Sequence, residues 1–197
     1  MVPKIDAFTI SEQRQSRQRQ IIDAAMELAV EGGASAITVS TVAKRAGIPR
    51  SSIYEYFSSS ADLVSDLIME ELENYGSRLS TAVKSSDDPY EYIENWIAES
   101  LKYIEDGRHM IAKSLNAITV PEYRRAEISA AHGRLMQSIA GPLQEIGIVD
   151  VRGALSYLQN TLDTAATRID SGKEPSAEVK LAQRYAMAGI KALTSMP

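Results

Sequence analysis

The chain has 197 residues, 44% of them hydrophobic and 24% charged, which is typical of a folded protein with one large domain or two small ones. The absence of cysteine excludes disulfides and thiolate catalysis, and no apolar run is long enough to cross a membrane, so we expect a cytoplasmic protein. The net charge of −5 argues against nucleic-acid binding by the chain as a whole. Residues 1–60, however, carry seven Lys and Arg against six Asp and Glu, so the acidic excess lies in the rest of the chain.

Three helices are predicted within the first sixty residues, and no convincing strand pattern interrupts them. Apolar residues at helical spacing indicate a first helix over residues 12–31, which a glycine pair ends. Thr38 is a suitable N-cap for a second helix that ends near Ala46. The Gly-Ile-Pro turn that follows opens a third helix over residues 50–57. The second and third of these helices therefore form a helix-turn-helix.

The third predicted helix has one apolar side and one polar side. Ile53 and Phe57 anchor it to the core. The residues left facing outward are Pro49, Arg50, Ser51, Ser52, Tyr54 and Tyr56. A helix that exposes small hydroxyls, an arginine and two tyrosines fits the major groove of DNA, and its N-terminus can receive a phosphate. The alternative is a helix pair used only for packing, with both tyrosines half-buried.

Six further helices are predicted in the rest of the chain. Their ranges are 61–83, 89–105, 108–117, 121–140, 150–170 and 176–194. Gly141 and Pro142 are expected to kink or break the helix over residues 121–140, because proline removes a donor and clashes with the preceding turn. The chain is therefore predicted to be all-α, with about nine helices in total.

The last two predicted helices carry the most regular apolar pattern. In residues 150–170 the apolar positions are spaced 4, 3, 4, 3 and 4 apart, as in a helix-packing seam. Residues 176–194 carry a similar seam. Beside it runs a second apolar row, formed by Leu181, Tyr185, Ala188 and Ala192. A helix with two apolar rows must be covered on both sides, so we predict a homodimer through residues 150–170 and 176–194. The alternative is that both rows are buried within one chain.

Several short segments of residues 18–67 follow one another in an order and spacing typical of one family. They are Ile21-Ile22-Asp23-Ala24-Ala25, Gly32-Gly33, Thr38-Val39, Ala46-Gly47-Ile48, Ser52-Ile53-Tyr54-Glu55-Tyr56-Phe57 and Leu63-Val64. With these segments in register, residues 18–67 resemble the DNA-binding domain of the TetR family of transcriptional regulators. The remainder of the chain shows no such motif and agrees with the family only in being all-helical and ending in two dimer-like helices.

This resemblance implies an N-terminal three-helix DNA-binding domain over residues 1–60 and a larger helical effector-binding and dimerisation domain over residues 61–197. It also implies a homodimer that binds double-stranded, palindromic operator DNA. The expected function is transcriptional regulation, usually by a repressor that a small-molecule effector of unknown identity releases from the operator. The alternative is a helical interaction or scaffold protein without DNA-binding activity.

The resemblance also assigns DNA-binding residues. They are Thr38, Lys44, Arg45, Pro49, Arg50, Ser51, Ser52, Tyr54, Tyr56 and Ser60. Thr38 would meet a phosphate, Arg50 is the expected base reader, and the two tyrosines would meet phosphates or thymine methyls. Ser60 stands where many members of the family have a lysine, which removes one ionic contact with a phosphate.

Residues that line an effector pocket are expected in the middle helices. The candidates are Met69, Tyr92, Trp96, Tyr103, Met110, Asn116 and Tyr123. The two histidines, His109 and His132, are too few and too far apart to suggest a metal site. We expect no cofactor and no enzymatic activity, because the chain lacks a phosphate-cradling glycine loop and any histidine paired by motif with a nucleophile.

Overall fold

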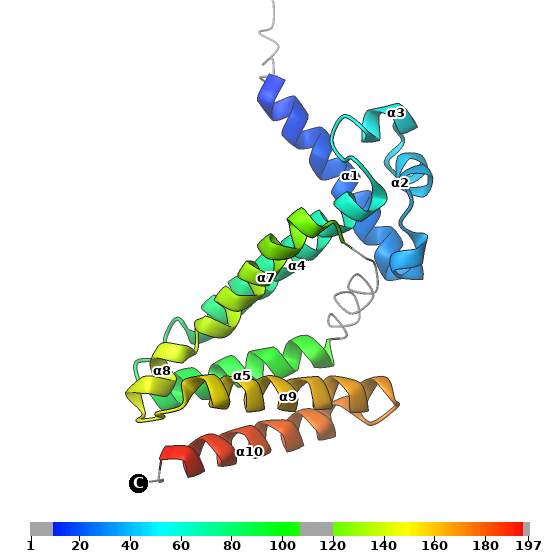
Figure 1. The fold of residues 1–197 in the computed structure, drawn as a ribbon. Helices are drawn as coiled ribbons and strands as arrows, with labels where there is room; N and C mark the ends of the chain where they lie inside the picture. The colour runs from blue at the N-terminus through cyan, green and yellow to red at the C-terminus, as the bar shows by residue number, and fades with distance from the viewer. Residues whose placement is uncertain (1–9, 107–119, 195–197) are drawn as a thin grey trace, which may run out of the picture. The chain divides into compact units, whose positions relative to one another are not determined.

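The computed structural model describes residues 10–106 and 120–194, and within these ranges every regular element is a helix (Figure 1). The helices are α1 (Ile10–Gly32), α2 (Val39–Ala46), α3 (Arg50–Ile53), α4 (Ser60–Val83), α5 (Pro89–Glu105), α7 (Glu122–Gln137), α8 (Ala140–Glu145), α9 (Val151–Asp170) and α10 (Pro175–Thr194), with a 3-10 turn at Ala34–Ala36. The predicted all-α class is confirmed. The helix predicted over residues 108–117, with His109, Met110 and Asn116, lies outside the described residues. None of the described helices is long and apolar enough to span a bilayer.

Packing divides the described chain into two compact units. The first comprises residues 10–68 and 120–125, and the second comprises residues 69–106 and 126–194. The division falls inside α4 and inside α7, so each of these helices contributes residues to both units. Packing thus groups the first turns of α4 with the N-terminal helices, and the functional boundary at residue 60 stays a prediction.

The first unit is organised by local backbone signals around a small apolar core. Thr38 and Thr41 form a capping box at the start of α2: each hydroxyl accepts a hydrogen bond from the other residue's N–H, at 3.1 and 3.0 Å. Gly47 ends α2 with a φ of 66°, a left-handed conformation that glycine adopts without strain. Ile21 of α1 and Ile53 of α3 are completely buried in this core.

The third helix is shorter than the sequence predicts. The prediction of a helix over residues 50–57 is wrong in its second half, because α3 ends after one turn at Ile53. The N–H groups of Tyr56 and Phe57 both donate to the Ile53 carbonyl, at 3.0 and 2.9 Å, which closes a turn and buries the Phe57 ring. The next N–H, that of Ser58, donates to the Asp62 carboxylate at 3.0 Å instead of continuing the helix.

The second unit surrounds a core to which α5, α8, α9 and α10 all contribute (Figure 1). Trp96 and Leu101 of α5 are completely buried in it. Asp88 and Asp150 cap α5 and α9, since each carboxylate accepts a hydrogen bond from the backbone N–H of the third residue of its helix.

The break predicted at Gly141-Pro142 lies a few residues earlier than expected. The preceding helix, α7, ends at Gln137, and both residues belong to the first turn of α8. Proline is tolerated there because the first N–H groups of a helix have no acceptor within the helix.

Candidate functional site

Most of the residues that the sequence predicts to face outward are exposed on α3 and on the residues directly before and after it, which together we call the α3 surface. Pro49, Arg50, Ser51 and Tyr54 are exposed, whereas Ser52 and Tyr56 are half-buried. The Arg50 guanidinium donates a long hydrogen bond of 3.4 Å to the Tyr54 hydroxyl one turn later. These residues therefore form one polar surface over the buried Ile53 side chain, and their contact with DNA remains a prediction.

Thr38 and Ser60 lie at the N-terminal end of α2. The Ser60 hydroxyl accepts a hydrogen bond from the Val39 N–H at 3.2 Å, so it satisfies one of the first donors of α2. The hydroxyl proton of Ser60 is left to donate elsewhere. Because the N–H groups of Val39 and Thr41 are already bonded within the protein, the start of α2 offers a phosphate the hydroxyl of Ser60 and the partial positive charge of a helix N-terminus.

The two basic residues of α2 differ in their surroundings. Lys44 is exposed. Arg45 is held against α1 by Glu31, at 2.6 Å, and Glu27, at 3.1 Å, and their hydrogen bonds raise its pKa further. The same pair lowers the pKa of Glu31. Because its charge is already paired, Arg45 is a weaker candidate for phosphate binding than Lys44.

Two contacts between α1 and the helix-turn-helix could not be predicted from the local sequence pattern. The Gln20 side chain donates to the Ala46 carbonyl at 2.7 Å, which ties α1 to the end of α2. The Arg14 guanidinium lies 5.4 Å from the centroid of the Tyr56 ring, within cation–π range. Arg14 therefore brings a positive charge from α1 close to the α3 surface.

The second unit contains a cavity of about 290 Å³ bounded by α4, α5 and α7. It is lined by Met69, Leu72, Glu73, Gly76, Leu79, Ser80, Val83, Tyr92, Trp96, Ala131, Arg134, Leu135 and Ser138. Ser138 holds part of the wall, since its hydroxyl accepts from the Trp96 indole at 3.0 Å and its carbonyl accepts from the Tyr92 hydroxyl at 3.2 Å. Burial raises the pKa of Tyr92. Of the predicted effector-lining residues, Met69, Tyr92 and Trp96 are brought together here.

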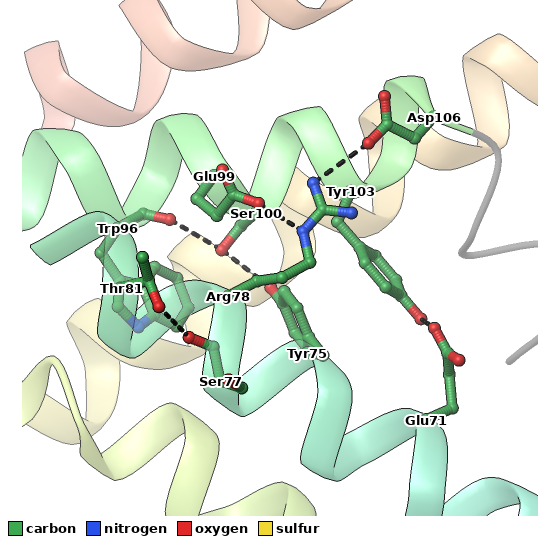
Figure 2. Close-up of polar contacts among 10 residues, drawn as sticks. All are labelled: Glu71, Tyr75, Ser77, Arg78, Thr81, Trp96, Glu99, Ser100, Tyr103 and Asp106. Carbon is green, nitrogen blue, oxygen red and sulfur yellow. Dashed lines mark hydrogen bonds and ion pairs between the residues drawn. The ribbon is translucent and has the colours of Figure 1, made fainter.

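Tyr103 lies instead in a cluster of polar contacts between α4 and α5, the α4–α5 polar cluster (Figure 2). Its hydroxyl donates to buried Glu71 at 2.8 Å, and its ring stacks on Tyr75 with centroids 4.4 Å apart. Tyr75 in turn donates to buried Ser100 at 2.8 Å, and burial raises the pKa of Tyr75 to about 12. Arg78 adds ion pairs with two carboxylates of α5 and its C-cap, at 2.5 and 3.0 Å. This cluster fastens one face of α4, while neighbouring positions of α4 line the cavity.

Tyr123 lies in neither place. In the first unit, its hydroxyl donates to Asp62 at 3.1 Å, and the next residue, Arg124, forms an ion pair with Asp66. We call these four residues the α4–α7 junction. Burial acts to raise the pKa of Asp62, but hydrogen bonds from Ser58 and Tyr123 outweigh it and hold that pKa below the ordinary 3.8. At Asp66 burial prevails over the charge of Arg124 and raises the pKa.

The terminal helices α9 and α10 expose an apolar face. Tyr157, Leu181 and Tyr185 are 76%, 58% and 71% exposed, and they border a broad hollow that also includes Gly189. The second apolar row of α10 is thus uncovered in the single chain, so burial of both rows within one chain is wrong. The Arg168–Glu178 pair, at 2.6 Å, closes the hollow at the end where the two helices join.

Comparison with known proteins places the first unit in a described family of domains. Residues 21–67 match the family model of bacterial regulatory proteins of the tetR family. Over 130 residues the chain is 25% identical to the HTH-type transcriptional repressor KstR of Mycolicibacterium smegmatis, covering 66% of this chain and 63% of that protein. Over 73 residues it is 34% identical to the fatty acid metabolism regulator protein of Bacillus subtilis, covering 37% and 38%. The matches thus span less than two thirds of these relatives.

Solved structures extend the likeness to most of the described fold. The fatty acid degradation regulator FadR from Bacillus halodurans superposes with a TM-score of 0.71 at 24% identity, covering 88% of this chain and 95% of that one. FadR from Bacillus subtilis, solved in complex with stearoyl-CoA, gives a TM-score of 0.70 at 25% identity, covering 87% and 98%. The helical architecture beyond residue 67 is therefore shared with these proteins, in addition to the N-terminal domain.

Proposed function

We propose that the protein is a sequence-specific DNA-binding transcriptional regulator, because residues 21–67 match the family model of bacterial regulatory proteins of the tetR family. The observation that supports the proposal most is the α3 surface. It presents Arg50 and Tyr54 to solvent over a buried apolar side, on a helix-turn-helix held by the Thr38 cap and the Gly47 turn. Direct reading of bases requires such an exposed helix with donors at its N-terminal half.

In this proposal the two ends of the helix-turn-helix have separate roles. Arg50 reads a base edge in the major groove, where a bidentate contact with guanine is the commonest specific contact. Thr38, Lys44, Ser60 and the N-terminus of α2 bind phosphates and fix the register on the duplex. Pro49, Ser51, Ser52, Tyr54 and Tyr56 complete the contact surface, and Arg45 keeps its pairing with α1.

The second copy needed for a palindromic operator occupies the apolar face of α9 and α10. A group of large apolar side chains as exposed as Tyr185 is uncommon on a surface that remains in contact with water. Small residues such as Gly189 allow two helix backbones to approach closely. A homodimer built through residues 150–170 and 176–194 carries two α3 surfaces. They must meet half-sites about one helical turn, roughly 34–36 Å, apart.

Repression that a small molecule relieves is the mode we propose, with the cavity of the second unit as the effector site. Its walls combine apolar Leu72, Leu79 and Leu135 with two charged residues, Glu73 and the exposed Arg134, so it suits a molecule with an apolar body and a polar end. The relative from Bacillus subtilis was solved with such a molecule, stearoyl-CoA. The effector acts by binding one conformation of the dimer more tightly than the other.

A mobility-shift titration tests the proposed function. Purified protein is added to the duplex upstream of its own gene, with an unrelated duplex of equal length as competitor, at low and at physiological salt. We expect a discrete complex that the competitor does not remove. A complex lost equally to any duplex, or no complex at low salt, would favour the alternative of a helical interaction protein.

A further inference from the structure

The first turn of α7 is joined to the start of α4 by two polar contacts, Tyr123–Asp62 and Arg124–Asp66. We propose that the α4–α7 junction positions the DNA-reading helix α3, with Asp62 as the residue that links the turn after α3 to α7. This inference rests on the proposed DNA-binding function. It adds a positioning residue to a region where the sequence motif assigns only DNA contacts.

Asp62 uses both of its carboxylate oxygens for this link. Oδ2 accepts from the N–H and from the hydroxyl of Ser58, both at 3.0 Å, while Oδ1 accepts from the Tyr123 hydroxyl at 3.1 Å. Ser58 directly follows Phe57, whose buried ring ends the turn after α3. One side chain therefore connects the exit of α3 to α7, and a shift of Tyr123 would act on the backbone at Ser58.

The second contact fixes the direction of the first. Asp62 and Asp66 are four residues apart and so share one face of α4, and they meet consecutive residues of α7. A single contact would let the first turn of α7 rotate about it, whereas two contacts one turn apart define both its position and its rotation.

The same helix also reaches the cavity of the second unit. Ala131, Arg134 and Leu135 of α7 line it, and Ser138, just past the end of α7, accepts the indole hydrogen bond of Trp96. An effector that moves α7 would thus move the junction, and by reciprocity DNA bound at α3 would change the affinity of the cavity for that effector. We expect the same movement of α7 to alter the cavity wall. Trp96 is the only tryptophan of the chain, so its fluorescence reports on that wall selectively.

The experiment consists of two parallel titrations, each with its own signal. The duplex that forms the specific complex, labelled with fluorescein, is titrated with full-length protein, and binding is read from anisotropy. A parallel titration with unlabelled duplex reads the emission of Trp96, excited where DNA and tyrosine do not absorb. We expect the wild-type emission to change as the duplex saturates the protein.

Two variants cut the junction. Tyr123→Phe removes one hydroxyl from a side chain that is 65% exposed, and Arg124→Gln removes the ion pair. We expect both to lose most of the Trp96 response at saturating duplex and to bind the specific duplex more weakly, within the roughly 5- to 150-fold range of allosteric couplings, with non-specific binding unchanged. Arg124→Lys, which keeps a positive charge toward Asp66, should recover part of both.

Matched controls remove similar groups elsewhere. Arg125→Gln changes the neighbouring exposed arginine, and Tyr90→Phe removes a hydroxyl that bonds Thr194 on α10. Both should behave as wild type. The proposal is overturned if the junction variants keep the full response and affinity, or if wild-type protein binds the duplex with no response at Trp96. A wild-type protein that shows no anisotropy change instead refutes the proposed DNA-binding function, on which this inference rests.

Discussion

At the scale of single residues, DNA binding depends on which charged side chains are not already paired within the protein. Arg50 is exposed and touches only the hydroxyl of Tyr54, at a long 3.4 Å, among the contacts of the described chain. Arg45 is already paired with two glutamates. Arg50 is therefore the residue expected to contact the bases, whereas Arg45 stabilises the fold of the first unit.

Replacement of Arg50 by alanine tests this assignment. Loss of a bidentate base contact costs about 1–3 kcal/mol, so Arg50→Ala should weaken specific binding roughly 5- to 150-fold and non-specific binding much less. Competition titrations with specific and unrelated duplexes measure both constants, and Arg125→Ala, which changes an exposed arginine of α7, is the control. Equal loss on both duplexes would mean that Arg50 touches only phosphate.

The ion pair between Arg45 and Glu31 leads to a prediction about the stability of the protein at acid pH. Because its pKa is lowered in the folded protein, Glu31 contributes stability above the ordinary value of 4.5 that is lost as the pH falls through the folded value. Urea unfolding from about pH 6 to about pH 3 should show a steeper loss of stability for wild type than for Glu31→Gln. Glu55→Gln, another exposed glutamate of the first unit, should follow wild type, and parallel curves for Glu31→Gln would reject the prediction.

At the scale of helices, the sequence indicates only those structural features that depend on neighbouring residues. The starts of the helices are an example. Thr38, Asp88 and Asp150 are capping residues whose hydrogen bonds reach only a few residues along the chain, so the starts of α2, α5 and α9 were predictable. The end of α3 was not, because Ser58 is captured by Asp62 after the chain has turned and Phe57 has found its place in the core.

The effector candidates show the same limit. Helical spacing indicates which face of a helix is apolar but not which neighbour that face meets. Met69, Tyr92 and Trp96 line a cavity, and their contact with an effector stays a prediction, whereas Tyr103 and Tyr123 donate hydrogen bonds to carboxylates of α4. Tyr123 and Asp62 are far apart in the sequence, and no spacing rule relates them.

The α4–α5 polar cluster carries a testable share of stability. Tyr75→Phe removes the hydroxyl that donates to Ser100, which is only 1% exposed, and should lower the free energy of unfolding by about 0.5–1.5 kcal/mol. Urea denaturation measures the change. Tyr90→Phe loses a bond of 3.2 Å near the end of α10 and should cost less. If both variants unfold alike, the cluster has no special role in fixing α4.

At the scale of the whole molecule, the protein is proposed to act as a dimer. Tyr185 and Leu181 are exposed in the single chain, so charging them should leave the subunit folded but prevent association. Sedimentation should show a dimer for wild type and a monomer for Tyr185→Asp with unchanged helical content. Val149→Asp, which changes a 99% exposed valine elsewhere, should remain dimeric. A wild-type monomer would remove the basis for a palindromic operator.

Selection of binding sites from random duplexes by the purified full-length protein decides whether this protein reads DNA sequence. We predict that sequencing will show an inverted repeat with half-site centres about one helical turn apart, since two α3 surfaces read one face of the duplex. We also predict that Arg50→Ala will lose this enrichment. A pool that stays random after repeated selection would contradict the proposal that this protein reads DNA sequence.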